Sequence, residues 1–133
     1  MTIRKVMETH PQPTRLDREV LAGCIAECME CAASCTSCAD ADLAEPDVQE
    51  MARCIRLCLD CSDICGATGR IVTRQTAADL DVLRVTVEAC AAACRVCGDE
   101  CERHASHHEH CRLCAESCRR CENACNALVA AIG

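Results

Sequence analysis

Cysteine is the residue type best able to do chemistry in this chain, and its positions follow a strict pattern. Eighteen of the 133 residues are cysteine, in four sets within which neighbours are alternately three and four residues apart. The sets are Cys24, Cys28, Cys31, Cys35 and Cys38; Cys54, Cys58, Cys61 and Cys65; Cys90, Cys94, Cys97 and Cys101; and Cys111, Cys114, Cys118, Cys121 and Cys125. Thiolates bind soft metals, act as nucleophiles and form disulfides, so the pattern has several chemical interpretations.

The spacing of the cysteines indicates the elements that position them. Gaps of three and four residues place each set on one face of an α-helix, so four sets predict four helices. Breaks occur around Pro46, over residues 69–75 and in the histidine-rich segment 104–110. Short connections make consecutive helices antiparallel neighbours. We therefore expect an all-α fold, an antiparallel up-down-up-down four-helix bundle with a cysteine-lined core.

The bundle is expected to comprise residues 16–133, with residues 1–15 as an N-terminal extension in which His10, Pro11 and Pro13 disfavour helix. Aliphatic residues continue the cysteine faces and should meet at one end of the bundle: Val20, Leu21, Val72, Leu80, Leu83, Val87, Leu128 and Ile132. The opposite end should gather Met51 and the histidines, with His104 and His108 continuing the face of Cys101. We expect Asp42, also at this end, to be solvated.

Composition narrows the class of protein. The chain has no Phe, Tyr or Trp, and its formal net charge of −7 makes nucleic acid and anionic lipid poor partners. No apolar run near the start suits a signal peptide, and no 18-residue apolar stretch predicts a membrane span. We therefore expect a cytoplasmic protein without membrane association. Thiols stay reduced in the cytosol, where cysteine clusters more often bind metal than form disulfides.

Packing and disulfides explain the cysteines poorly. Leucine would bury about two more carbons at each position, worth roughly 1–2 kcal/mol, so packing alone does not favour cysteine. Side chains three or four residues apart on a helix have β carbons about 5–6 Å apart, whereas a disulfide needs roughly 3.5–4.5 Å. Catalysis is also disfavoured, because no single thiol is distinguished by a base and an orienting group. We therefore expect no enzyme activity.

A bridging metal ion fits the same geometry. Two thiolates on one ion lie about 4.6 Å apart when the arrangement is linear, with the zinc–sulphur length as a guide. Thiolates select Cu(I), Zn(II) or iron–sulphur clusters. Monovalent copper balances thiolate charge at about one ion per cysteine. Zinc at one ion per two thiolates also balances it, so a metallothionein-like zinc or cadmium sink and a thiol redox reservoir remain alternatives.

The four cysteine faces and the histidine-rich join before Cys111 closely resemble those of the bacterial copper storage proteins, specifically the cytosolic members without an export signal. The resemblance covers nearly all of the chain after residue 15. It implies a four-helix bundle, assembled as a homotetramer, whose cysteine thiolates bind many Cu(I) ions. Copper enters at one end in that family, where histidines or methionines supplement the thiols; His104, His108 and His110 match that place.

Our hypothesis is a cytosolic store in which all eighteen cysteines bind Cu(I), at roughly one ion per cysteine. His107, added because it lies near the matching histidines, and Met51, which lies on a cysteine face, join the residues expected to take part in copper uptake. Copper chaperones or copper enzymes are candidate partners. The aliphatic positions also predict that the metal-free protein is already helical, unlike zinc fingers, which need metal to fold.

Overall fold

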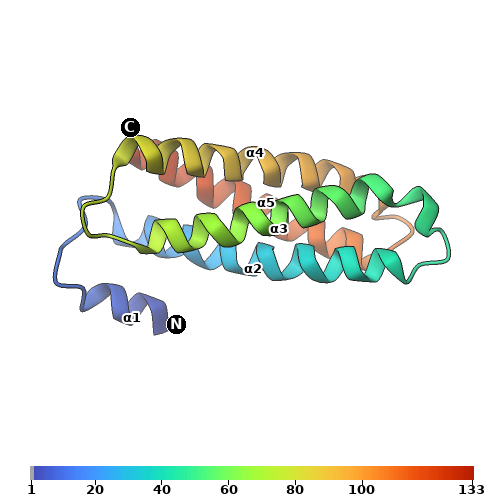
Figure 1. Cartoon of the computed structure of the whole chain (residues 1–133), viewed down its shortest axis with the longest axis horizontal. Helices are drawn as coiled ribbons and strands as arrows, with labels where there is room; N and C mark the ends of the chain where they lie inside the picture. Colours follow the sequence, from blue (N-terminus) through green and yellow to red (C-terminus); the bar gives the residue numbers. More distant parts are fainter. Residues whose placement is uncertain (1) are drawn as a thin grey trace.

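The computed structural model describes residues 2–133, and every regular element in this range is helical (Figure 1). A short helix precedes four long ones, and a single 3-10 turn lies between two of them. The elements are α1 (Thr2–Glu8), α2 (Arg18–Leu43), η1 (Val48–Glu50), α3 (Ala52–Thr73), α4 (Leu80–His104) and α5 (Glu109–Ile132). The all-helical class predicted from the sequence is confirmed for these residues.

The four long helices lie alongside one another, and each packs against two others (Figure 1). Helix α2 contacts α3 and α5, and α4 contacts the same two helices. Aspartates fix two of the helix starts: Asp17 accepts a hydrogen bond from the Val20 amide at 3.0 Å, and Asp79 accepts from the Asp81 and Val82 amides at 2.9 and 3.0 Å. These caps satisfy amides that have no partner inside the helix.

The core consists largely of sulphur. All eighteen cysteines are buried, none more than 2% exposed. Leu21, Val72, Val87 and Leu128, which we call the aliphatic end, are also fully or almost fully buried. Val20 and Ile132 are half-buried, and Leu83 is 6% exposed.

Leu80 departs from the prediction that it is buried at the aliphatic end. As the first residue of α4, it is 40% exposed and lines a surface pocket with Leu83 and with residues 12–16, 74–75 and 77–78.

Residues 1–15 also differ from expectation, because α1 forms there. The predicted helix breakers His10, Pro11 and Pro13 all follow its last residue, so they end the helix without preventing it. Met7 is only 8% exposed, Ile3 packs against the core, and Arg4 forms an ion pair with Glu19 at the start of α2. The extension therefore lies against the long helices.

Helix α2 is long and apolar enough to cross a membrane by length and composition, contrary to the sequence-based expectation that no segment is. Its apolar character comes mainly from alanine and five cysteines. Those cysteines face sulphur atoms of the other long helices, so in this structure α2 is a core helix.

Candidate metal centre

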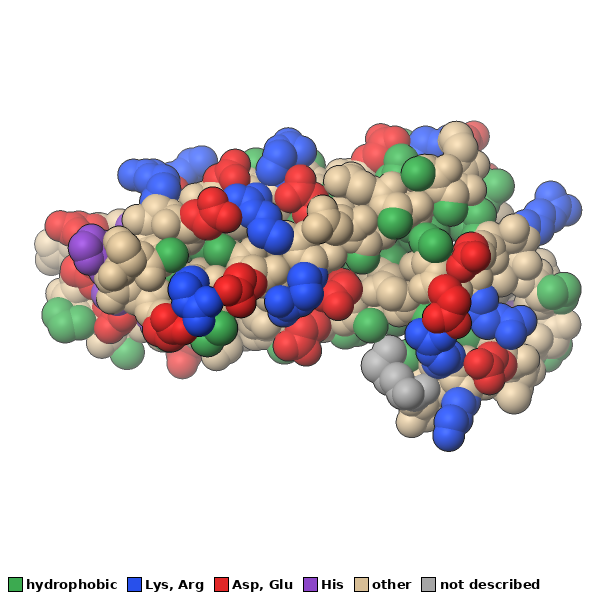
Figure 2. All heavy atoms as spheres, turned by 180° about the vertical axis from the view of Figure 1, so that it is seen from behind, with side chains coloured by type: hydrophobic (Ala, Val, Ile, Leu, Met, Phe, Trp, Pro, Cys, Tyr) green, Lys and Arg blue, Asp and Glu red, His purple; other side chains and the backbone are tan. Residues whose placement is uncertain are grey.

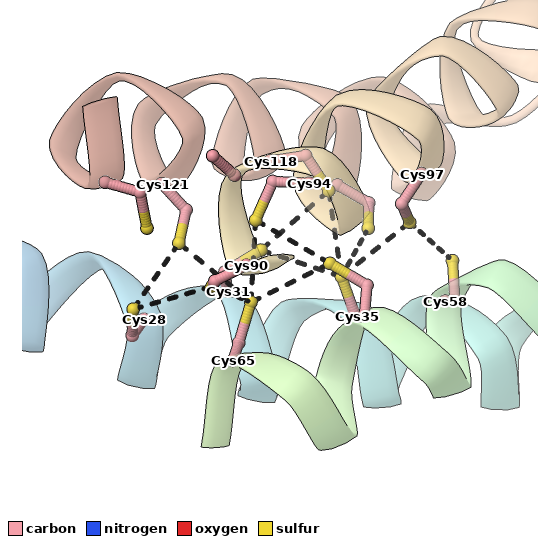
Figure 3. Close-up of a cluster of buried hydrophobic side chains, with 14 of the residues drawn as sticks. Cys28, Cys31, Cys35, Cys58, Cys65, Cys90, Cys94, Cys97, Cys118 and Cys121 are labelled. Atoms are coloured by element: carbon pink, nitrogen blue, oxygen red, sulfur yellow. Dashed lines mark hydrogen bonds between the residues drawn. The ribbon is translucent and has the colours of Figure 1, made fainter. Parts of the chain in front are cut away.

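The thiols form a continuous set of close contacts within and between helices (Figure 3). Along α2, the Cys31 and Cys35 Sγ atoms are 3.7 Å apart. Between helices, the Sγ atoms of Cys65 and Cys94 are 3.5 Å apart, and those of Cys35 and Cys118 are 3.7 Å apart. These separations exceed the roughly 2.05 Å of a disulfide, and all eighteen cysteines are free thiols.

Groups of four cysteines converge closely enough to share an ion. In each of five such groups, all Sγ atoms lie within 4.8 Å of one another. The groups are Cys28, Cys90, Cys121 and Cys125; Cys31, Cys65, Cys94 and Cys121; Cys31, Cys35, Cys61 and Cys118; Cys35, Cys97, Cys114 and Cys118; and Cys38, Cys54, Cys58 and Cys101. Cys31, Cys35, Cys118 and Cys121 each belong to two groups. Shared sulphurs link the first four groups into one chain of sites.

The closest sulphur pairs fit a bent arrangement around an ion better than the linear one considered from the sequence. Three pairs four residues apart, Cys24/Cys28, Cys31/Cys35 and Cys61/Cys65, lie 3.9, 3.7 and 3.7 Å apart. A trigonal ion with metal–sulphur bonds of the zinc length would place its sulphurs about 4.0 Å apart, compared with about 4.6 Å for a linear ion. The third sulphur then comes from a neighbouring helix.

Two of the metal-free thiols, Cys35 and Cys111, are held in their protonated form. Hydrogen bonding with Cys114, together with burial, raises the pKa of Cys35. Burial, followed by the nearby Asp42 carboxylate, raises the pKa of Cys111. A metal ion must therefore displace protons from these thiols as it binds.

Asp42 does not lie in solvent as predicted, but is fully buried beside the last cysteine of α2, Cys38, and the first cysteine of α5, Cys111. Its Oδ1 accepts a hydrogen bond from the Cys111 thiol at 3.6 Å, and its Oδ2 has no partner. Burial raises the pKa of Asp42 to about 7. It faces inward because it lies four residues after Cys38, on the same side of α2.

Among the histidines, His110 is the one in contact with sulphur. Its Nδ1 lies 3.4 Å from the Cys38 Sγ and 3.6 Å from the Cys111 Sγ. Its Nε2 is 3.1 Å from a Glu45 oxygen. We call the region formed by Cys38, Asp42, His110 and Cys111 the mouth. Figure 2 shows histidine gathered with acidic side chains at one end of the molecule.

The other histidines contact carboxylates or face solvent. His108 begins α5 as its N-cap instead of continuing α4, and its ring lies between Glu45 and Asp47. The hydrogen bond to Asp47 raises the pKa of His108. His104 ends α4 with its Nε2 3.0 Å from Glu100, and His107 is exposed. Met51 is fully buried at the start of α3.

Comparison with known proteins identifies the family. The profile of the copper storage protein family, Csp, matches residues 17–130. The chain belongs to the copper storage protein family. This confirms the resemblance drawn from the cysteine spacing. Among curated proteins, none matches the chain at a significant level.

Solved structures of the copper storage protein Ccsp from Streptomyces lividans are similar to this family member. One, loaded with 10 copper equivalents, is 49% identical, with 97% of this chain and 98% of that chain covered and a TM-score of 0.95. Another, a cytosolic copper storage protein with five coppers, is 53% identical over 86% of this chain and 96% of that chain, with a TM-score of 0.86.

For this copper storage protein, sequence reasoning missed the carboxylates that surround the histidines. Glu45, Asp47 and Glu100 contact His110, His108 and His104, respectively. Glu100 is 5% exposed and also pairs with Arg53 and Arg103. Glu100 lies three residues after Cys97 and one before Cys101, and this helical spacing could have indicated that its side chain is buried. Glu45 and Asp47 lie in a connection between helices, where residue spacing does not predict the path of the chain.

Proposed function

We propose that this member of the copper storage family holds many Cu(I) ions on its cysteine thiolates, at about one ion per cysteine. The observation that carries the proposal is the chain of four-cysteine groups linked by shared sulphurs. A thiolate that bridges two ions lets the number of ions approach the number of cysteines. All eighteen cysteines then act as ligands, and copper is cargo instead of a catalytic cofactor.

Charge and sulphur spacing are both compatible with Cu(I) as this cargo, and the copper-loaded relative favours Cu(I) over zinc. One monovalent ion per thiolate leaves the buried core neutral. Sulphur separations of 3.5–4.0 Å fit a trigonal ion with shared ligands, and Cu(I) accepts soft sulphur ligands. The related Streptomyces lividans protein, loaded with 10 copper equivalents, supports the same assignment.

The proposal also includes the direction of the four long helices and the extent of the bundle. We infer an antiparallel up-down-up-down four-helix bundle over residues 16–133, with residues 1–15 as an extension packed outside it. The mutual packing of α2 to α5 and their short connections support this arrangement. By the family resemblance we propose a homotetramer, and a cytoplasmic location agrees with the cytosolic relative and with reduced thiols.

The protein is proposed to be a store without enzyme activity, which receives copper from, or passes it to, copper chaperones or copper enzymes. His104, His107, His108, His110 and Met51 are proposed to take part in copper uptake. The observations that support these residues differ. His110 contacts sulphur, whereas His107 is exposed and is included only because it lies near the histidines that match the family.

Competition between metals tests the proposed cargo. The reduced protein is titrated anaerobically with Cu(I) against a chromogenic chelator, with thiols counted in the same sample, and then challenged with excess Zn(II). We expect about one retained copper per thiol and no displacement by zinc. Saturation at a few copper ions, or replacement of copper by zinc, would contradict the proposal and favour a zinc sink.

A further inference from the structure

Two of the eighteen thiols differ from the others in their exposure. Cys38 and Cys114 are each 2% exposed, whereas every other cysteine is 0% exposed. Both of these residues line the same surface pocket, which lies between α2 and α5. A molecule that enters this pocket from solvent therefore meets two thiols of the core directly, through the side of the helices.

Short side chains on α2 leave room for the pocket. Ala33, Ser34 and Ser37 line it from α2, and Leu113, which is 51% exposed, lines it from α5. Its volume is about 330 Å³, at the lower end of the roughly 300–1,000 Å³ that is usual for small-molecule sites. We call this cavity the lateral pocket. Its size suits a small molecule and is too small for a folded protein domain.

The two thiols of the lateral pocket belong to different four-cysteine groups. Cys114 shares a group with Cys35, and their Sγ atoms are 3.7 Å apart. Cys35 also belongs to a second group, so Cys114 is one sulphur contact away from the chain of linked sites. Cys38 belongs to another group, which includes Cys101. Copper ions that move between neighbouring sulphurs can therefore reach the lateral pocket from two parts of the core.

We propose that the lateral pocket binds a low-molecular-weight thiol, which removes Cu(I) from Cys114 and Cys38 by ligand exchange. The inference rests on the proposed storage function and extends it to release of the cargo. In each exchange a bond forms between copper and the sulphur of the incoming thiol, and the bond between copper and the cysteine breaks. The proton of the incoming thiol passes to the released cysteine. Copper remains Cu(I), so no electron is transferred.

The chemistry of the cargo selects a thiol over other small ligands. Soft thiolate ligands select Cu(I), whereas carboxylates and carbonyls suit harder ions, so a second thiolate competes best with cysteine for copper. Low-molecular-weight thiols are kept reduced in the cytosol. The hydroxyls of Ser34 and Ser37 offer hydrogen bonds to polar groups of such a molecule, while Ala33 and Leu113 offer it apolar contacts.

Alkylation of the reduced, metal-free protein tests access through the lateral pocket. A short pulse of iodoacetamide, followed by peptide mass mapping, should modify Cys38 and Cys114 about tenfold faster than thiols that react only after local opening of the helices. Ala33→Leu should fill the pocket and slow both reactions. Ala89→Leu, at an exposed position of α4, is the matched control and should slow neither. Faster modification of Cys111 than of Cys114 would overturn this route.

Copper release tests the ligand. The Cu(I)-loaded protein is mixed anaerobically with an excess of a bulky chromogenic chelator, and the rate of copper transfer is measured at increasing concentrations of glutathione. The rate should rise and then saturate, because the lateral pocket holds one thiol molecule at a time. S-methylglutathione, which has no free thiol, should not raise the rate. A rate that glutathione does not raise, or raises without saturation, would overturn the proposed binding site.

Variants that fill the lateral pocket connect the ligand to the site. Ala33→Leu should remove most of the glutathione-dependent rate, and Ser37→Leu, which fills the pocket from the next turn of α2, should do the same. Ala89→Leu should leave it unchanged, and circular dichroism checks that each variant is helical. A glutathione-dependent rate that survives both pocket variants would overturn the proposal.

Copper capacity, measured in the same samples, separates this inference from the proposed function. Capacity near one copper per cysteine without an effect of glutathione would refute the lateral pocket alone. Capacity of only a few ions would refute the storage function itself.

Discussion

The aliphatic end and the sulphur-lined core are buried to the same degree but contribute differently. Leu21 and Leu128 are completely buried, and so are Cys35 and Cys118 in the middle of the core. Burying a leucine side chain contributes about 1.5–3 kcal/mol, whereas a cysteine buries less apolar surface and is retained for its reactivity more than for packing. The comparison suggests that one end stabilises the helices while the thiols are left to bind metal.

The absence of aromatic residues increases the contribution of the aliphatic end to stability relative to that of the thiols. Aromatic side chains usually dominate the energetics of a core, and this chain has none. The few large aliphatic side chains must therefore contribute a disproportionate share of the stability of the metal-free protein.

The largest expected effect is loss of stability at the aliphatic end. Leu128→Ala should lower the free energy of unfolding of the reduced, metal-free protein by about 2–5 kcal/mol, because it leaves a cavity. Urea denaturation measures this loss. Leu113→Ala, at a position on the same helix that is 51% exposed, is the control and should change it by less than about 0.5 kcal/mol. The folded Leu128→Ala protein should bind as many copper ions as the unmodified protein. A fall in copper capacity in step with the loss of stability would show that the aliphatic end and the sulphur-lined core do not act independently.

An effect of intermediate size on the free energy of unfolding is expected from the titration of Asp42 at the mouth. Its pKa is raised from the ordinary 3.8 to about 7, so between these values the folded state binds more protons than the unfolded state. The free energy of unfolding should therefore fall as pH rises from about 4 to 7, by about 3 kcal/mol in total. Urea denaturation at pH 5 and pH 7 measures the change.

Asp42→Asn should flatten most of this pH dependence. A smaller slope should remain, because the raised pKa of His108 also makes stability fall as pH rises through its titration. An equally steep slope in Asp42→Asn would show that the Asp42 carboxyl does not cause it.

The smallest effect on stability is expected within the sulphur-lined core. Cys35→Ala should change the free energy of unfolding by about 1 kcal/mol. Capacity should nevertheless fall by about one to two copper ions, because Cys35 belongs to two of the four-cysteine groups. Asn123→Ala, at an exposed position of α5, is the control for both measurements. Unchanged capacity in Cys35→Ala would mean that the central thiols are not ligands.

Periodicity explains why so much of the core could be predicted. A three-four spacing maps directly onto one helix face, so the burial of all eighteen cysteines and of Leu21, Val87 and Leu128 follows from sequence. The same reasoning should have placed Asp42 inside, since it lies four residues after Cys38. Its charge favours solvent, whereas its position on the cysteine face favours burial, and the position prevails.

The arrangement at the mouth could not be predicted in the same way. Glu45 and Asp47 meet His110 and His108 across more than sixty positions of chain, through two connections without periodicity. Loop paths depend on backbone geometry that residue spacing does not encode. Helix α1 is not predicted by the prolines of the extension, because they limit where a helix ends and say nothing about the residues before them.

Far-ultraviolet circular dichroism during an anaerobic Cu(I) titration tests the central claim most directly, because it follows folding and loading in one sample. If the aliphatic end folds the chain and the thiols only bind, the reduced metal-free protein is strongly helical, and its helix signal stays constant while about one copper per cysteine is taken up in competition with a chelator. A metal-free protein without helix signal, which gains helix only as copper binds, would contradict the account.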